Sequence, residues 1–214
     1  GIYKFDSDYM LKNKEYENII EIWKLSIEKA SILLVPIVVF CLIFGNEIII
    51  SLFSDKYESA VIIFQAYMFQ WLRAVIIFGG VMGAIGLEKE LFKNTVIISI
   101  LNIILNYFLI LEFGVIGAAI ATTFLNYVGV IPLILKINKK LGSNFFTYFP
   151  YKIYFTSLFL SLSIGYFLFF FLKEYLDSFI SITLVSIVFY VVVIALQLRI
   201  FYKEVSYKKL RELL

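Results

Sequence analysis

Residues 179–198 of this chain read FISITLVSIVFYVVVIALQL, a stretch without a charged side chain. A helix of about 20 apolar residues is long enough to cross the roughly 30 Å of hydrocarbon in a bilayer. The stretch therefore predicts a transmembrane helix, which we extend to residue 201.

The composition of the whole chain also indicates a location in lipid. Of its 214 residues, 62% are apolar and only 16% are charged, whereas soluble domains have about 25% charged residues. The charged residues form short clusters that separate long apolar runs. We predict an all-α integral membrane protein with about six transmembrane helices, at residues 30–44, 60–87, 91–111, 115–135, 153–172 and 179–201.

The segments around these spans complete the predicted organisation. Apolar residues recur on one face of residues 13–29, so we expect residues 1–29 to be a cytoplasmic lead-in with an amphipathic interfacial helix. Residues 45–47 should break the chain after the first span. The remaining parts are a four-helix region at 30–135, a cytoplasmic loop at 136–152, two additional helices at 153–201 and a cytoplasmic tail with a second interfacial helix at 202–214.

The basic residues predict the orientation of the chain. If successive loops alternate between the two sides of the membrane, sixteen of the 19 Lys and Arg residues fall on one side. Lys56 and Lys173 fall on the other, and Arg73 lies inside a span. The side rich in Lys and Arg is normally cytoplasmic. We therefore expect a multi-pass protein of the cell membrane with both termini in the cytoplasm.

Two residue types limit the chemistry that the chain can perform. Cys41 is the only cysteine and there is no histidine, so a disulfide, a zinc site and His-based catalysis within the chain are excluded. We expect no metal, no cofactor and no enzymatic activity. The basic residues lie in loops and form no basic domain, so we expect no nucleic-acid partner.

Arg73 is a charged residue near the middle of the predicted second span. An ionised side chain there costs at least about 2.5 to 3.5 kcal/mol unless it meets water, an anion or polar groups. Gln70 lies about one turn earlier on the same face. The pattern predicts either a cationic site in a polar cavity or an arginine that helix carbonyls and amides satisfy.

A polar stripe follows one face of the predicted third span, where polar residues recur at helical spacing. The stripe either lines a hydrated cavity or makes interhelical hydrogen bonds of roughly 0.6 to 2 kcal/mol each. Both readings stay open, with Thr122 and Asn126 of the fourth span as expected partners. The stripe consists of Thr95, Ser99, Asn102 and Asn106. Our candidate substrate-binding residues are Arg73, Gln70, Ser99, Asn102, Asn106 and Asn126.

Small residues in the second and fourth spans predict close helix packing, because they let helix backbones approach each other. The fifth and sixth spans are rich in Phe and Leu, and we expect them to face lipid. The expected packing residues are Gly79, Gly83, Gly114, Gly117, Ala118 and Ala121.

Two stretches resemble a known family. The first is GNEII at residues 45–49 followed by LFSDKYESA at 52–60, and the second runs from Leu101 and Asn102 to FGVIGAAIAT at 113–122. Together they resemble the C-terminal region of polysaccharide biosynthesis proteins, the O-antigen and teichoic-acid exporter branch of the multidrug/oligosaccharidyl-lipid/polysaccharide superfamily. The resemblance covers about residues 9–140.

The resemblance implies that the six helices are similar to the last six of a fourteen-helix flippase. The chain would then be its C-terminal half, with the missing N-terminal helices as partners. Such a protein carries an undecaprenyl-diphosphate-linked glycan from the cytoplasmic to the outer leaflet through a central cavity, without covalent chemistry. Arg73 would contact the diphosphate and the Asn102 stripe the sugars. The implied partners are this lipid-linked glycan and membrane lipid.

Three other functions remain open. A multidrug or peptidoglycan-precursor exporter belongs to the same superfamily, although drug exporters of this kind depend on acidic cavity residues and the predicted spans carry none near their middle. A membrane-bound glycan transferase or polymerase would need reactive groups in sizeable loops, and the loop at 136–152 contains no acid. A non-catalytic scaffold of six helices has little need for a charge inside a span.

Overall fold

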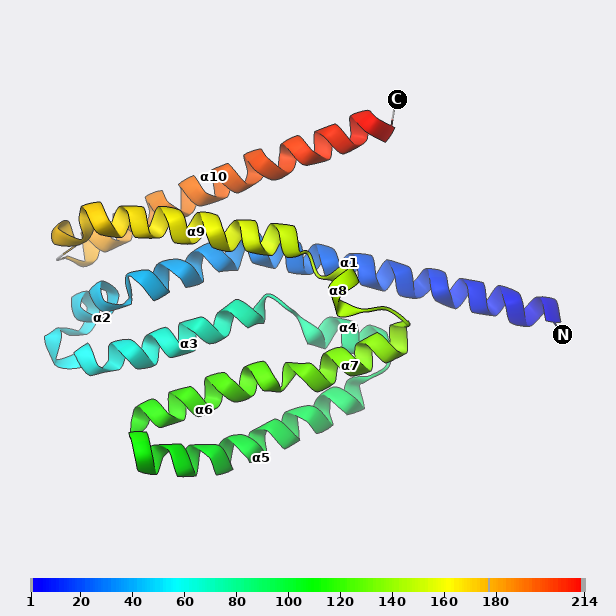
Figure 1. The fold of residues 1–214 in the computed structure, drawn as a ribbon, viewed down its shortest axis with the longest axis horizontal. Coiled ribbons are helices and arrows are strands. Elements are labelled where there is room, and N and C mark those ends of the chain that lie inside the picture. The colour runs from blue at the N-terminus through cyan, green and yellow to red at the C-terminus, as the bar shows by residue number, and fades with distance from the viewer. Residues whose placement is uncertain (1, 177, 213–214) are drawn as a thin grey trace. The chain divides into compact units, whose positions relative to one another are not determined.

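The computed structural model describes the backbone of residues 2–176 and 178–212, and the side chains of residues 15–172, 174–176 and 178–201. Within these residues every regular element is a helix (Figure 1). Two 3-10 helices, η1 (Asp55–Ala60) and η2 (Lys173–Tyr175), accompany the α-helices. The α-helices are α1 (Ile2–Ile43), α2 (Gly45–Phe53), α3 (Val61–Ala74), α4 (Phe78–Ala84), α5 (Glu88–Phe113), α6 (Val115–Val128), α7 (Val130–Leu141), α8 (Phe145–Tyr148), α9 (Tyr151–Leu172) and α10 (Phe179–Glu212).

Six helical stretches in the described chain are long and apolar enough to cross a membrane, which confirms the predicted fold class. They are Glu15–Ile43, Asp55–Ala84, Glu88–Phe113, Val115–Leu141, Tyr151–Leu172 and Phe179–Phe201. The orientation of these helices remains a prediction from the distribution of Lys and Arg.

Two predicted interfacial helices are not separate elements. α1 is continuous from Ile2 to Ile43, and α10 is continuous from Phe179 to Glu212. No glycine or proline interrupts either chain at the expected boundaries, residues 29 and 201, so the helices have no local reason to end there. Residues 213–214 of the predicted tail lie outside the described residues. The break after the first span falls at residue 44, and residues 45–47 begin α2.

The predicted second span is also interrupted, because α3 ends at Ala74 and α4 starts at Phe78. The intervening residues 75–77 are Val-Ile-Ile. The same residue types, Val-Val-Val-Ile at 191–194, stay helical within α10, so residue type alone does not cause the break. The Ile76 N–H donates to the Arg73 carbonyl at 3.0 Å, which forms a tight turn at this point. Arg73 therefore lies in the last turn of a helix and not within a continuous one.

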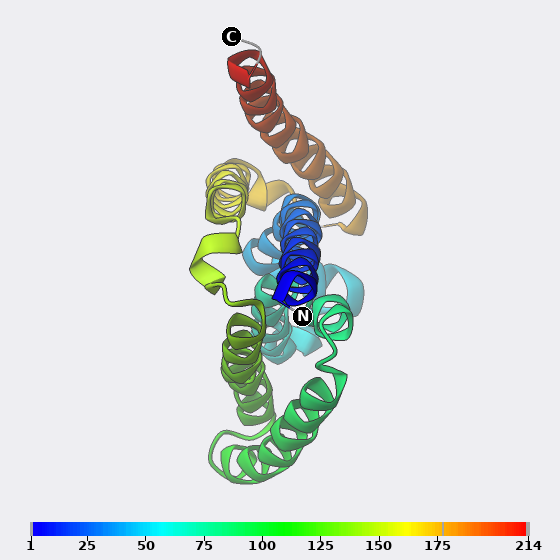
Figure 2. The ribbon, with the colours of Figure 1, turned by 90° about the vertical axis from the view of Figure 1, so that its right-hand side faces the viewer.

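Compact packing divides the chain into two units, and the first comprises residues 1–29 and 73–150. In its core the ring of Trp23 packs against Phe78 and Tyr148, at centroid distances of 6.0 and 4.9 Å. Helices α5 and α6 lie side by side as an antiparallel pair (Figures 1 and 2). The single residue between them, Gly114, has a φ of +60°, a conformation that glycine adopts without strain.

The second unit comprises residues 30–72 and 151–214. Its apolar core combines residues of α1 and α10 with Phe44 and Leu176, which lie between helices. The core residues are Phe40, Phe44, Leu176, Ile182, Phe189 and Val193. Gly165 of α9 lets this core close tightly, because a Cβ atom there would lie 2.5 Å from Ile43 Cδ1. The long α9 and α10 helices contact each other within this unit.

Candidate functional site

A polar cavity of about 650 Å³ lies in the first unit, between the end of α3 and helices α5, α6 and α7. Three asparagines, three hydroxyl side chains and one arginine interrupt its otherwise apolar wall. No acidic side chain is found among the described residues that line it. The cavity therefore offers one positive charge and many hydrogen-bonding groups. The polar lining consists of Arg73, Asn94, Thr95, Ser99, Asn102, Thr122 and Asn126.

Arg73 has few hydrogen bonds for a charged side chain in an apolar helix. Its Nη2 donates to the Asn126 Oδ1 at 3.5 Å, a long contact. Its Nε is buried and has no partner among the described residues. Asn126 is held in place by its Nδ2, which donates to the Thr122 carbonyl at 2.9 Å. The guanidinium thus meets an amide, and its charge is not neutralised within the cavity.

The polar stripe of α5 combines the two roles that its sequence left open. Asn102 Nδ2 donates to Thr122 Oγ1 of α6 at 3.2 Å, an interhelical hydrogen bond. Asn106 Nδ2 donates to Asn102 Oδ1 at 2.9 Å and so supports it. Thr95, Ser99 and Asn102 also line the cavity. The stripe both joins two helices and supplies polar groups to the space beside them.

Two predicted site residues lie apart from this cavity. Gln70 is not among its lining residues and belongs to the second unit. Asn106 reaches the cavity only through its bond to Asn102, and its Oδ1 has no described partner. Conversely, the sequence did not single out Asn94, whose Nδ2 donates to the Gly129 carbonyl at 3.0 Å. Its spacing of eight residues from Asn102 was the available signal.

A hydrogen bond from α1 stabilises the helix break beside Arg73. The indole N–H of the buried Trp23 donates to the carbonyl of Ile77 at 2.8 Å, at the point where α4 begins. A tryptophan N–H usually finds such a partner when it is buried. Trp23 therefore fixes the start of α4 and, through it, the wall of the cavity formed by Phe78.

The predicted packing residues behave in different ways. A Cβ atom at Gly117 would lie 2.0 Å from the Leu109 carbonyl oxygen, so this glycine lets α6 touch the backbone of α5. Ala121 is fully buried, whereas Ala118 is partly buried. Apart from the nearby backbone of α4 and the adjacent residues, no described atom lies within 4 Å of a Cβ added at Gly79 or Gly83. Gly114 acts in the turn between α5 and α6, so its role is conformational.

A second polar cluster, in the second unit, was not predicted. Gln197 Nε2 of α10 donates to Ser157 Oγ of α9 at 2.8 Å, and Ser157 Oγ donates to the Ser31 carbonyl of α1 at 3.0 Å. Ser161 Oγ donates to the Ser157 carbonyl at 2.7 Å. All four residues are fully buried, and Gln197 Oε1 has no partner in the described chain.

This cluster shows that the predicted fifth span, α9, has one face that is not exposed. One face of α9 is buried against other helices, and its residues Ser157, Ser161 and Gly165 are all shielded. They recur every four residues, which is the spacing of one helix face. The abundant Phe and Leu on the other faces hid this short stripe of small residues in the sequence.

Comparisons with known proteins do not assign the chain to a family. No protein-family model, no curated protein and no solved structure matches it. The resemblance to polysaccharide exporters therefore remains a prediction. Within its described residues the structure is all-helical, with six helices that could cross a membrane and a polar, cationic cavity beside a helix break.

Proposed function

We propose that the chain belongs to a membrane transporter that moves a lipid with an anionic, sugar-containing headgroup to the outer leaflet. A glycan linked to a polyprenyl diphosphate is such a lipid. The observation that carries the proposal is the environment of Arg73. A guanidinium in a bilayer-spanning helix is costly without a counter-charge, and none of the described cavity residues supplies one. A phosphate group would pair with it by charge-assisted hydrogen bonds.

The rest of the cavity supports the sugar part of this ligand. Asn102, Asn126 and Ser99 carry groups that donate and accept hydrogen bonds, as sugar hydroxyls require. A polar headgroup needs such a path through hydrocarbon, while its lipid tail can stay in the bilayer. The break after α3 fits the same role, because transporter sites often lie where a membrane helix is discontinuous.

The test is transport by the intact protein in liposomes. A fluorescent glycolipid with a diphosphate linkage is placed in both leaflets, and a membrane-impermeant reductant quenches the label in the outer leaflet. Arg73→Gln should lower the transport rate roughly tenfold or more, because a hydrogen bond to a charged group contributes about 1.5 to 3 kcal/mol. Arg199→Gln is the matched control, since Arg199 is exposed at the end of the sixth span.

Two further results decide the proposal. A glycolipid without phosphate should be transported no more slowly by Arg73→Gln than by the wild-type protein, because it carries no phosphate group for Arg73 to bind. Equal rates for the diphosphate lipid in the wild type and in Arg73→Gln would remove Arg73 from the mechanism and would contradict the proposal.

A further inference from the structure

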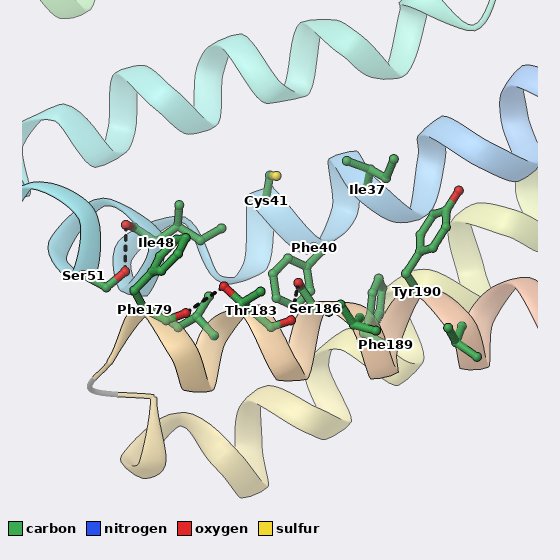
Figure 3. A pocket seen from close by; sticks show the side chains of 13 residues that line it. Ile37, Phe40, Cys41, Ile48, Ser51, Phe179, Thr183, Ser186, Phe189 and Tyr190 are labelled. Atoms are coloured by element: carbon green, nitrogen blue, oxygen red, sulfur yellow. Dashed lines mark hydrogen bonds between the residues drawn. The ribbon is translucent and has the colours of Figure 1, made fainter.

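A second cavity, of about 440 Å³, lies within the second unit. Its walls are formed by residues 37–41 of α1, residues 48–51 of α2 and residues 179–191 of α10. Figure 3 shows the side chains of these residues on the three helices. None of these residues lines the polar cavity of the first unit, so the two spaces are separate sites.

Three hydroxyl groups of this cavity donate hydrogen bonds to backbone carbonyls of their own helices. Ser51 Oγ donates to the Ile48 carbonyl at 3.1 Å. Thr183 Oγ1 and Ser186 Oγ donate at 2.8 Å to the carbonyls of Phe179 and Thr183 (Figure 3). None of the described lining residues is charged. The cavity therefore offers a polar ligand few groups to bind, and its surface is mainly hydrocarbon.

Its position on two candidate membrane spans limits what can fill it. Both α1 and α10 contribute stretches that could cross a bilayer, Glu15–Ile43 and Phe179–Phe201, and the lining residues lie inside these stretches or in α2 beside them. An apolar cavity tends to exclude water. Left empty, its lining would lose dispersion contacts. At this position the available apolar molecules are the chains of membrane lipids.

We propose that this cavity binds one acyl chain of a membrane phospholipid. Its volume falls in the range of about 300 to 1,000 Å³ that is typical of ligand sites. Phe40 and Phe189 form a well-packed part of the wall, because both side chains are buried in the core and their ring centroids lie 5.3 Å apart. The lipid would act as a resident component of the second unit. The proposal does not rest on the transport function proposed above.

Adjacent substitutions on α10 test this site. Thr183→Trp adds an indole to the lining and fills part of the cavity. Leu184→Trp adds the same group at the next residue, which is 60% exposed and does not line the cavity. The intact protein is released from nanodiscs of palmitoyl-oleoyl phosphatidylglycerol and weighed by native mass spectrometry. We expect one phospholipid to stay bound to the wild type and to Leu184→Trp, and Thr183→Trp to lose it.

A second measurement uses the wild-type protein and needs no substitution. Cys41 is the only cysteine and lines the cavity, so an acyl chain there should slow its alkylation by N-ethylmaleimide when the phospholipid is added to delipidated protein. Equal lipid retention in Thr183→Trp and the wild type, or an alkylation rate that phospholipid does not change, would overturn the proposal. Slowing by a polyprenyl phosphate alone would overturn it too, because the occupant would then not be an acyl chain.

Discussion

A single added methyl group should have different effects on stability at two glycines of the first unit. Gly117→Ala would drive a Cβ to 2.0 Å from the Leu109 carbonyl oxygen, and neither backbone can move without separating α6 from α5. We expect it to lower the free energy of unfolding by about 1 to 3 kcal/mol or more. Gly83→Ala meets no described atom within 4 Å beyond its own helix backbone and the adjacent residues, and should leave the free energy of unfolding unchanged or raise it by up to about 1 kcal/mol.

Thermal unfolding of both variants in the same detergent, followed by circular dichroism, measures this difference. Equal midpoints for the two variants would show that α5 and α6 do not approach as closely as the structure has them.

Helical periodicity accounts for the cavity residues that the sequence identified. Ser99 and Asn102 fall on one face of α5, and the structure places both in the cavity with Arg73 and Asn126. The same reasoning put Gln70 beside Arg73, but a helix face does not reveal which neighbour covers it. Periodicity gives the direction of a side chain and not the shape of the space that it enters. That space depends on the packing of other helices.

At the level of elements, the break between α3 and α4 depends on a hydrogen bond from another helix. Trp23→Phe keeps most of the ring packing but removes the N–H that donates to the Ile77 carbonyl. We expect a loss of about 0.5 to 1.5 kcal/mol in the free energy of unfolding, because the Ile77 carbonyl loses this hydrogen bond. Trp71→Phe is the control, since Trp71 is 50% exposed. Chemical denaturation of the two variants tests this, and equal losses would contradict it.

The buried cluster of the second unit predicts unequal costs for its members. Ser157→Ala removes both the acceptor of the Gln197 amide and the donor to the Ser31 carbonyl, and should cost about 1 to 3 kcal/mol. Gln197→Met should cost less, because the Gln197 Oε1 already lacks a partner in the described chain.

A double-mutant cycle on the free energy of unfolding measures the coupling of this pair. The double variant should be more stable than the sum of the single effects implies, since no amide then remains buried without its serine. Strictly additive effects would show that Gln197 and Ser157 do not interact.

Apolar runs were sufficient to predict the number of candidate spans, because crossing hydrocarbon requires a minimum length of apolar helix. They did not predict the start of the first, which was expected at residue 30 and lies at Glu15. They did not predict the break at residues 75–77, which contains neither glycine nor proline. They also did not predict the buried face of α9. Both features depend on contacts between helices distant in sequence, Trp23 with Ile77 and Ser157 with Gln197.

At the scale of the whole molecule, the distribution of Lys and Arg makes a testable statement about topology. In a Cys41→Ser background, Ser59→Cys lies in the predicted outer loop and Ser143→Cys in the predicted cytoplasmic loop. A membrane-impermeant maleimide applied to intact cells should label the first and spare the second. Permeabilised cells should show labelling of both, which controls for reactivity. The reverse pattern in intact cells would invert the predicted orientation.

The unbroken course of α10 has a mechanical consequence. Its 34 residues at about 1.5 Å each come to about 51 Å, whereas the hydrocarbon layer is about 30 Å thick. A straight helix of this length cannot lie flat on the membrane at one end and cross it at the other. The C-terminal part of α10 therefore moves rigidly with the sixth span. A change in the tilt of that span displaces the tail, and a force on the tail changes the tilt of the span.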